Sequence, residues 1–235
     1  MERMEPFTQL QLLSSTSPIT ASSLCGTLLY TSTNTSLSIT NLTTSTLSST
    51  SILSSGSSVS KILPLPSSDT VLLLIGTILR DIDGVVVATG VVDCVVDEVV
   101  GSGRVAVAKR RGVSIWDAGW KGNVDVEGVV CMSLVGDILC IAGKCSSITI
   151  VDYEMYKIVK LGGKNNVVPL FPYDRLKGKP IITQVGQEFL LVTSLSNDRG
   201  LGVFVNHFGD AVRGTLSYES IPSSIGILNN VINCF

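Results

Sequence analysis

The chain has 235 residues, of which 15% are charged and 45% hydrophobic, and its formal net charge is −2. Disordered segments are poor in the Val, Ile and Leu that dominate here, and nucleic-acid-binding proteins normally carry a basic surplus. The composition therefore argues against both classes. The length permits one large all-β domain or two small ones, and it is sufficient to bury a sizeable core.

The N-terminal residues MERMEPFTQLQLL contain no continuous apolar stretch followed by a small-residue cleavage site, so they do not resemble a secretory signal. The longest apolar run, Val71–Leu79, is far shorter than the roughly 20 residues of a membrane-spanning helix, and we interpret it as a buried pair of strands. The six cysteines lack tight paired spacing: Cys25, Cys94, Cys131, Cys140, Cys145 and Cys234. We expect reduced, mostly buried thiols in a cytoplasmic protein.

Signals for helices are almost absent. Short segments rich in Val, Ile, Leu, Thr and Ser alternate with Gly, Asn or Asp turns, which is the signature of strands and hairpins. The predicted fold class is all-β.

The stretch Ser14–Ser60 is more than half Ser and Thr and has no charged side chain. A glycosylated, mucin-like stalk is one interpretation, and Asn34 and Asn41 begin glycosylation sequons. We favour ordinary strands with Thr and Ser on the solvent face, because leucines and isoleucines recur at strand spacing. Around residues 43–60 we predict a flexible loop.

A unit of apolar strand, short polar hairpin, second apolar strand and small polar residue recurs along the chain. The copies are Gly26–Asn41, a less regular one from Asp69 to Asp83, Arg104–Asp117, Asp137–Asp152 and Glu188–Asn206. Three copies end alike, in Trp116-Asp117, Val151-Asp152 and Val205-Asn206. We expect this polar residue to follow the third strand of a blade, where the chain turns toward the outermost strand.

Copies start about every 35 to 50 residues, the period of propeller blades. Blades that stack radially protect each other's faces and edges. Residues 1–235 are therefore predicted to form one WD40-like β-propeller with about five blades, and Ile227–Phe235 the first strand of a sixth. We expect an incomplete ring and a fragment of a longer protein.

Two glycine motifs superficially suggest nucleotide binding. Gly101-Ser102-Gly103 precedes an alternating β-branched stretch instead of the helix that would face a pyrophosphate, so it is interpreted as a turn. Gly162-Gly163-Lys164 lacks the Ser or Thr of a phosphate loop and is interpreted as a loop leaving a strand. No cofactor is predicted.

Candidate catalytic groups are few. His207 is the one histidine and lies in a predicted hairpin turn, and the acids Asp93, Asp97 and Glu98 are expected to be solvated at a strand edge. Cys140 and Cys145 have no second ligand pair at zinc-finger spacing, and Lys109–Arg111 is expected at a hairpin tip. The sequence thus predicts no catalytic residue, no metal site and no enzyme, and it does not identify a binding surface.

The C-terminal third contains a recognisable pattern over Val167–Ile227. It is a strand of Gly, aliphatic, Phe, Val and Asn, followed by a Gly turn, an Arg, an aromatic residue and a Pro. Here these are Gly202, Val203, Phe204, Val205, Asn206, Gly209, Arg213, Tyr218 and Pro222.

This pattern resembles the citron-homology (CNH) domain, which usually has Trp where this chain has Tyr218. The segments Val168–Tyr173 and Pro180–Ser194 look like the vacuolar-sorting branch, in particular the fungal CORVET-specific subunit and its relative, the transforming-growth-factor-β-receptor-associated protein. The resemblance implies an N-terminal propeller of a CORVET or HOPS tethering subunit, without catalytic residues.

The resemblance further implies a peripheral protein of the endosomal or vacuolar membrane that binds a Rab-type small GTPase and other tethering subunits. Its motif residues are expected to be structural: Gly202 and Gly209 permit tight backbone, Phe204 packs between blades and Arg213 bridges strands. Open alternatives are the CNH domain of a kinase or Rho exchange factor, a propeller hydrolase or lectin acting through the central channel, and a secreted Ser/Thr-rich adhesin.

Overall fold

The computed structural model describes residues 18–34, 36–44, 46–51, 58–65, 70–97, 103–117, 121–145, 153–162, 166–174, 176–195, 199–228 and 231–234. These residues form twenty-two β-strands and no helix, so none of them contributes a helix that could cross a membrane. The all-β prediction is confirmed.

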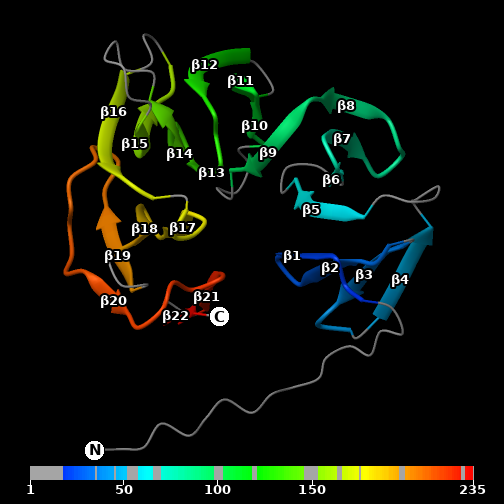
Figure 1. Cartoon of the computed structure of the whole chain (residues 1–235). Coiled ribbons are helices and arrows are strands. Elements are labelled where there is room, and N and C mark those ends of the chain that lie inside the picture. Colours follow the sequence, from blue (N-terminus) through cyan, green and yellow to red (C-terminus); the bar gives the residue numbers. More distant parts are fainter. Residues whose placement is uncertain are drawn as a thin grey trace, which may run out of the picture.

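The strands form successive antiparallel sheets, each paired in chain order and arranged around a common centre (Figure 1). Blades 1 to 3 comprise β1 (Ala21–Cys25), β2 (Leu28–Ser32), β3 (Ser36–Asn41), β4 (Thr46–Ser51); β5 (Val59–Pro64), β6 (Val71–Ile75), β7 (Ile78–Asp81), β8 (Val86–Thr89); and β9 (Val91–Val96), β10 (Val105–Lys109), β11 (Arg111–Trp116), β12 (Lys121–Glu127).

The remaining strands form blades 4 and 5 and a two-stranded sixth sheet. They are β13 (Cys131–Val135), β14 (Ile138–Cys145), β15 (Tyr153–Lys160), β16 (Asn166–Pro172); β17 (Ile181–Val185), β18 (Glu188–Ser194), β19 (Gly200–Val205), β20 (Leu216–Tyr218); and β21 (Ile225–Leu228), β22 (Val231–Cys234). Five four-stranded blades and the start of a sixth agree with the prediction.

The second strand of a blade is apolar at nearly every position because both of its faces are covered. In β10, Val105 and Val107 pack in the cluster shared with blade 2, whereas Ala106 and Ala108 pack in the cluster shared with blade 4. Successive side chains of a strand point to opposite faces, so a doubly covered strand has no alternating polar position. The same reason accounts for the long apolar run at Val71–Leu79, which forms β6 and β7.

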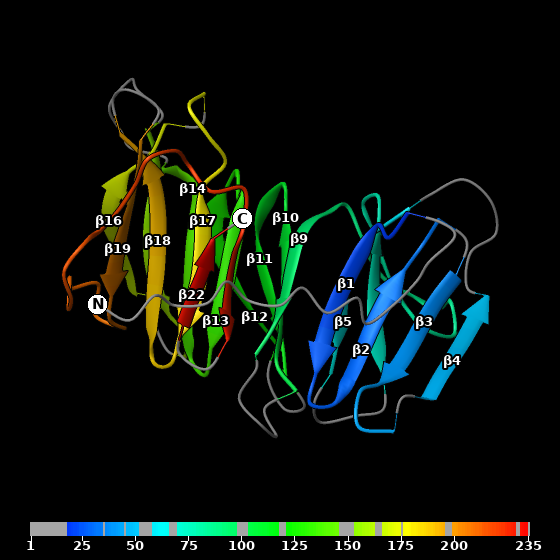
Figure 2. The same cartoon turned by 90° about the horizontal axis from the view of Figure 1, so that it is seen from below.

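The core is therefore divided into five clusters, one at each contact between neighbouring sheets. Seen from the side, the strands of adjacent blades run next to one another (Figure 2). The largest buried side chain, Tyr156 of β15, lies in the cluster between blades 4 and 5. Its hydroxyl donates a hydrogen bond to the carbonyl oxygen of Val192 in β18, and its ring lies 5.2 Å from that of Phe171.

In two of the repeats, the polar residue that ends the repeat accepts a backbone amide of the turn after the third strand. Asn41 Oδ1 accepts the amide of Thr43 at 2.9 Å, and Asn206 Oδ1 accepts the amide of Phe208 at 2.9 Å. Such side-chain turns are the reason that Asn and Asp are favoured there. Asp81 does the same at the end of β7 for the amide of Val85, at 2.8 Å.

The predicted flexible loop at residues 43–60 is wrong over much of its length. Thr46–Ser51 forms β4, which pairs with β3, and Val59 begins β5. Residues 52–57 lie outside the described residues. Ser and Thr made this segment look like a loop, but a solvent-facing outer strand accepts such residues.

Two further boundaries differ from the prediction. The second strand of the Asp137–Asp152 repeat was expected before Asp152, yet β14 pairs with Tyr153–Lys160, and residues 146–152 lie outside the described part. The sixth sheet is a hairpin that begins at Ile225, not a single strand from Ile227. Apolar residues on both sides of a turn leave strand boundaries ambiguous in the sequence.

We predict that Tyr156→Phe lowers the free energy of unfolding by about 1–3 kcal/mol, because the carbonyl of Val192 then loses its buried donor. Urea denaturation followed by circular dichroism measures the change. An unchanged midpoint would show that the hydroxyl contributes nothing to the contact between blades 4 and 5.

Candidate functional site

A central cavity of about 820 Å³ lies where the innermost strands β1, β5, β9, β13, β17 and β21 meet. Its polar lining comes from blades 1, 2, 4 and 5: Ser23, Lys61, Ser133, Thr183 and Gln184. Most of the remaining lining is aliphatic. Among the described residues, its titratable side chains are Lys61 and Cys25.

The charge of Lys61 is neutralised at the contact between blades 2 and 3. Its Nζ lies 2.8 Å from Asp93 Oδ1, and the Asp93 side chain is 14% exposed. Asp93 is therefore not solvated as predicted but is paired with a residue of the neighbouring blade. An ion pair that spans two innermost strands fixes the blades relative to one another.

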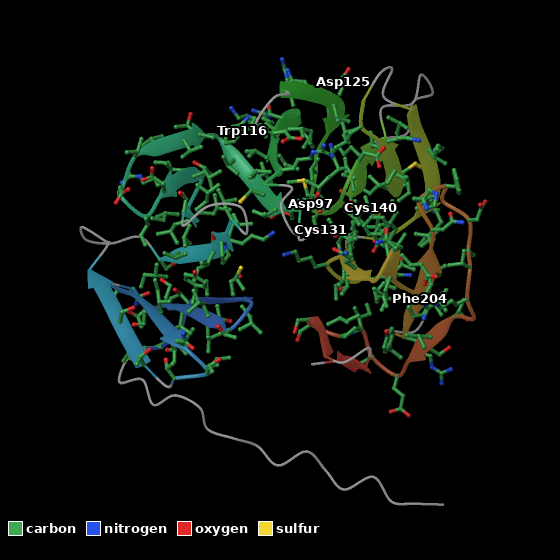
Figure 3. All side chains as sticks on the ribbon, turned by 180° about the vertical axis from the view of Figure 1, so that it is seen from behind. Asp97, Trp116, Asp125, Cys131, Cys140 and Phe204 are labelled. Atoms are coloured by element: carbon green, nitrogen blue, oxygen red, sulfur yellow. The ribbon has the colours of Figure 1, made fainter. Side chains whose placement is uncertain are left out.

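Asp97 contradicts the sequence prediction most clearly, because it is 1% exposed. Its Oδ1 accepts the amide of Gly136 at 3.1 Å, across the contact from blade 3 to the β13–β14 turn of blade 4. Figure 3 shows Asp97 near the ring centre and Asp125 on the outer rim. A buried carboxylate requires hydrogen-bond donors, and the amide of this turn supplies one.

Arg104 binds the carbonyl of the same turn residue. Its guanidinium donates to the oxygen of Gly136 and, through Nε and Nη2, to Asp117 Oδ2 at 3.1 and 2.9 Å. Asp117 is the polar end of the WD dipeptide, so its side chain orients Arg104. Asp97 and Arg104 together hold both polar backbone groups of Gly136, and the β13–β14 turn is thereby fixed to blade 3.

The three candidate catalytic groups that lie within the described residues do not converge. His207 is exposed in the turn after β19, as predicted, with its ring 3.9 Å from that of Phe208. Asp93 and Asp97 lie on blade 3, and none of the three lines the central cavity. Glu98 lies outside the described residues. Among the described residues, the lining of the central cavity includes neither the candidate acids nor the histidine.

The described glycines of the two motifs have turn conformations, and the basic run lies at a hairpin tip. Gly103 has φ +58° and is followed by strand β10, not by a helix, and Gly162 has φ +91° just after β15. Residues 101–102 and 163–165 lie outside the described part. Lys109–Arg111 forms the β10–β11 hairpin tip, where Arg110 and Arg111 are exposed. The hairpin interpretation of Lys109–Arg111 is confirmed, and Gly103 and Gly162 agree with the turn interpretation of their motifs.

The described thiols are reduced and shielded. Cys94 and Cys140 are fully buried, whereas Cys25 and Cys131 are partly buried. Burial raises the pKa of the Cys94 thiol to about 12 and that of Cys131 to about 12, because it disfavours the thiolate. No group of three or more potential metal ligands occurs among the described residues.

The residues of the CNH resemblance have the structural roles expected of them. A Cβ on Gly202 would lie 3.0 Å from Leu190 Cδ1, so the strands approach closely there. Phe204 is 5% exposed and packs in the cluster between blade 5 and Ile225 of the sixth sheet. Arg213 places its guanidinium 5.2 Å above the Phe204 ring and its Nε 2.6 Å from Glu188 Oε2 on β18.

Sequence reasoning missed the links between blades. The sequence around Gly136 contains no pattern that predicts binding of its backbone by two side chains of the preceding blade. The motif that could have indicated the link is Trp116-Asp117, because an Asp that closes a third strand is available to orient an arginine.

No family model matches the chain, and no curated protein matches it. Solved structures match it well. The AfRom2 CNH domain has a TM-score of 0.58 at 16% identity, with 92% of this chain and 78% of that chain covered. Kluyveromyces lactis Hsv2 has a TM-score of 0.60 at 14% identity, with 88% and 66% covered. The WD40 propeller domain of Doa1 has a TM-score of 0.58 at 12% identity, with 94% and 76% covered.

These similarities identify the fold as a β-propeller, and a CNH domain is among the solved structures that share it. A luciferin-regenerating enzyme also has this fold, with a TM-score of 0.52 at 10% identity and with 92% of this chain and 81% of that chain covered. The fold alone therefore does not distinguish a scaffold from an enzyme. The vacuolar-sorting branch of the resemblance stays a prediction.

We predict that Asp97→Ala lowers the free energy of unfolding by about 1–3 kcal/mol, because the amide of Gly136 loses its acceptor. Asp125→Ala is the matched control, since Asp125 is exposed on the outer strand of the same blade; its effect should stay within about 0.5 kcal/mol. Chemical denaturation of both variants measures the difference. Equal effects would contradict the link between blades 3 and 4.

The buried thiols predict a loss of stability at alkaline pH. The pKa of Cys94 is about 12 in the folded chain against a usual value near 9, so the thiol favours folding fully below pH 9 and progressively less above it. Each such thiol should cost about 1.4 kcal/mol between pH 8 and pH 10. Cys94→Ala should lose less stability than the unchanged chain over that interval in urea denaturation. Parallel losses in the two proteins would rule out this contribution.

Proposed function

We propose that the chain is a non-enzymatic protein-interaction scaffold. The proposal rests on where the candidate catalytic side chains lie and on what they bind. The ionisable side chains that sequence reasoning offered for catalysis either join blades, as Asp93 and Asp97 do, or project from a turn, as His207 does. The central cavity has a lysine that is already paired.

A surface at the boundary of blades 4 and 5 is suited to a protein contact. Exposed apolar side chains lie there on β16, which contacts the β19–β20 turn at Gly209, and on the turn itself: Val168, Phe208 and Val212. We call this set the blade 4–5 patch. Exposed apolar clusters on such surfaces mark interaction sites.

Phe208 is presented by a turn with little freedom. Asn206 Oδ1 accepts the amides of Phe208 and Asp210 at 2.9 and 3.0 Å. Gly209 has φ +91°, and a Cβ there would lie 2.6 Å from Leu170 Cδ2, so the turn sits directly on β16. A preorganised aromatic side chain contributes to affinity because little conformational entropy is lost on binding. Phe208 remains 65% exposed.

The proposed partners are a Rab-type small GTPase and other subunits of a CORVET- or HOPS-type tethering complex. The proposed location is cytoplasmic, on the periphery of endosomal or vacuolar membrane. The residues over Val167–Ile227 that resemble the vacuolar-sorting branch support this choice, and they include the whole blade 4–5 patch. Several modest contacts on one scaffold would hold two membranes at high effective concentration.

The test is a pull-down of the tagged chain with GTP-locked and GDP-locked endosomal Rab proteins as separate baits. We expect enrichment on the GTP form, and a loss of at least fivefold for Phe208→Ser. Leu176→Ser is the matched control, because Leu176 is 98% exposed but lies outside the patch; it should bind as the unchanged chain does.

Three other outcomes of the pull-down would contradict parts of the proposal. Equal recovery on the two nucleotide forms would contradict a Rab effector. Binding that survives Phe208→Ser would move the contact away from the blade 4–5 patch. No enrichment of any Rab or tethering subunit would favour the signalling branch of the CNH resemblance, in a kinase or Rho exchange factor.

A further inference from the structure

The connection between β16 and β17 presents the most exposed large apolar side chain of the described part of the chain. We call residues 174–180 the 174–180 loop. Its Leu176 is 98% exposed, whereas the next in the order of exposure, Phe208, is 65% exposed. Figure 2 shows this yellow connection projecting past the ends of the strands. A single exposed leucine is ordinary, so its surroundings decide what it can bind.

Both ends of the 174–180 loop are fixed to blade 4. The amide of Tyr173 donates to the carbonyl oxygen of Glu154 on β15 at 3.1 Å, and the Tyr173 side chain is buried. At the other end, Cys131 Sγ donates to the carbonyl oxygen of Pro180 at 3.2 Å. The middle of the loop is therefore presented from a fixed base.

Asp174 holds Leu176 in a tight turn. Its Oδ1 accepts the amide of Leu176 at 3.0 Å, and its carbonyl oxygen accepts the amide of Lys177 at 3.1 Å. Asp closes such turns by binding the backbone two residues further on. A Cβ on Gly178 would lie 2.9 Å from Ile221 Cδ1, so the loop also packs on the β20–β21 connection. Because the turn is preorganised, little conformational entropy is lost when the leucine is buried by a partner.

The apolar tip is flanked by positive charge. The sequence of residues 174–180 contains three cationic side chains and one acidic side chain. Lys179 is exposed. The Nζ of Lys177 lies 3.8 Å from Asp174 Oδ2, and both side chains are 45% exposed. Exposed pairs of this kind contribute little, so the loop keeps a positive charge beside its leucine.

The β18–β19 connection adds to the same surface. Ser194 Oγ lies 3.5 Å from the carbonyl oxygen of Asp174, which places the end of β18 beside the 174–180 loop. Leu195 follows and is 38% exposed, and its amide donates to the carbonyl oxygen of the exposed Arg199 at 2.7 Å. Two apolar and three cationic side chains thus form what we call the loop surface: Leu176, Lys177, Lys179, Leu195 and Arg199.

Such a surface suits an anionic bilayer better than a protein. A bilayer closes around a projecting apolar side chain, and Lys and Arg beside it reach the headgroups while their stems stay in the apolar zone. At protein interfaces, by contrast, lysines are depleted and an apolar anchor enters a pocket. Anionic lipids also attract each Lys or Arg near the membrane surface.

We propose that the loop surface binds an anionic lipid bilayer, with Leu176 inserted among the acyl chains and the cations against the headgroups. The proposal rests on the membrane location proposed above but not on the Rab contact. Phe208 follows the C-terminal end of β19, whereas Arg199 precedes its N-terminal end. The blade 4–5 patch and the loop surface therefore lie at opposite ends of the same strand and can be occupied together.

Co-sedimentation of the purified chain with vesicles, without any Rab protein, tests the proposal. We expect binding to mixed phosphatidylcholine and phosphatidylserine, and little binding to phosphatidylcholine alone. Leu176→Ser should lower the partition coefficient roughly tenfold, because the inserted side chain is lost. Lys179→Gln should lower it about fivefold, because one cation near the anionic surface is lost. Circular dichroism should show that both variants retain their strand content.

A change of opposite sign is expected at Glu219. This exposed acid follows β20 next to the Gly200–Tyr218 pair, and so lies at the same end of blade 5 as Arg199. It repels anionic lipid, so Glu219→Gln should strengthen binding to the mixed vesicles. Weaker binding by this variant would contradict an electrostatic contact at this end.

Leu47→Ser and Lys160→Gln are the matched controls. Leu47 is 64% exposed on β4, in a blade without a charged residue between Ala21 and Ser51. Lys160 is exposed where β15 ends beside the start of β16, whereas the 174–180 loop follows the end of β16. Both variants should bind the mixed vesicles as the unchanged chain does.

Fluorescence quenching measures insertion directly. The emission of Leu176→Trp should be quenched by vesicles with brominated acyl chains, because the new indole lies among those chains. The unchanged chain gives the baseline from its own tryptophans, and Leu47→Trp should show no quenching beyond it.

Failure of this proposal is distinguishable from failure of the proposed function. Loss of vesicle binding by Leu176→Ser, with its Rab pull-down unchanged, would support two separate surfaces. Equal binding to the two kinds of vesicle, binding that survives Leu176→Ser, or an equal loss in the controls would overturn the lipid contact whatever the pull-down shows. No binding to either vesicle would also overturn it, and would leave an acidic protein as the partner of these cations.

Discussion

Neighbouring blades of this chain bury one another's apolar faces, and no blade could bury both of its own. The two residue sets of β14 show this directly: Leu139 and Ile141 pack toward blade 3, whereas Ile138, Cys140 and Ala142 pack toward blade 5. Because the core lies between the sheets, the stability of each blade depends on the blade beside it. The uninterrupted apolar strands follow from that dependence.

The polar contacts between blades have a different role from the apolar ones. Apolar packing is non-directional, so it would tolerate a small rotation or slide of one blade against the next. Hydrogen bonds and ion pairs have defined geometry. The bonds from Asp97 and Arg104 to Gly136, and the pair of Lys61 with Asp93, hold neighbouring blades at one position. Asp93 and Asp97, which the sequence offered as candidates for chemistry, therefore align the blades.

How much the sequence could predict differs between elements. The hairpins at Arg104–Asp117 and Glu188–Asn206 were predictable, because their turns contain the residues that short turns require. The strand β15 was misplaced, because two apolar stretches follow β14 and periodicity does not say which one pairs with it. The candidate acids were assigned to solvent, since a carboxylate in a strand is usually exposed. What covers Asp97 is a turn 39 residues further along the chain.

By itself, the sequence determined the fold class, the repeat of the blades and the resemblance to the CNH domain, because strand propensity, turn residues and short motifs are local properties. It also determined which positions are apolar. Only the tertiary structure decided which face of each strand meets which neighbour, that Asp93 and Asp97 join blades, and that the turn at Gly209 packs against β16. These facts depend on the order in which sheets stack around the centre. Stacking brings together residues that are distant in the sequence, and no local pattern records such contacts.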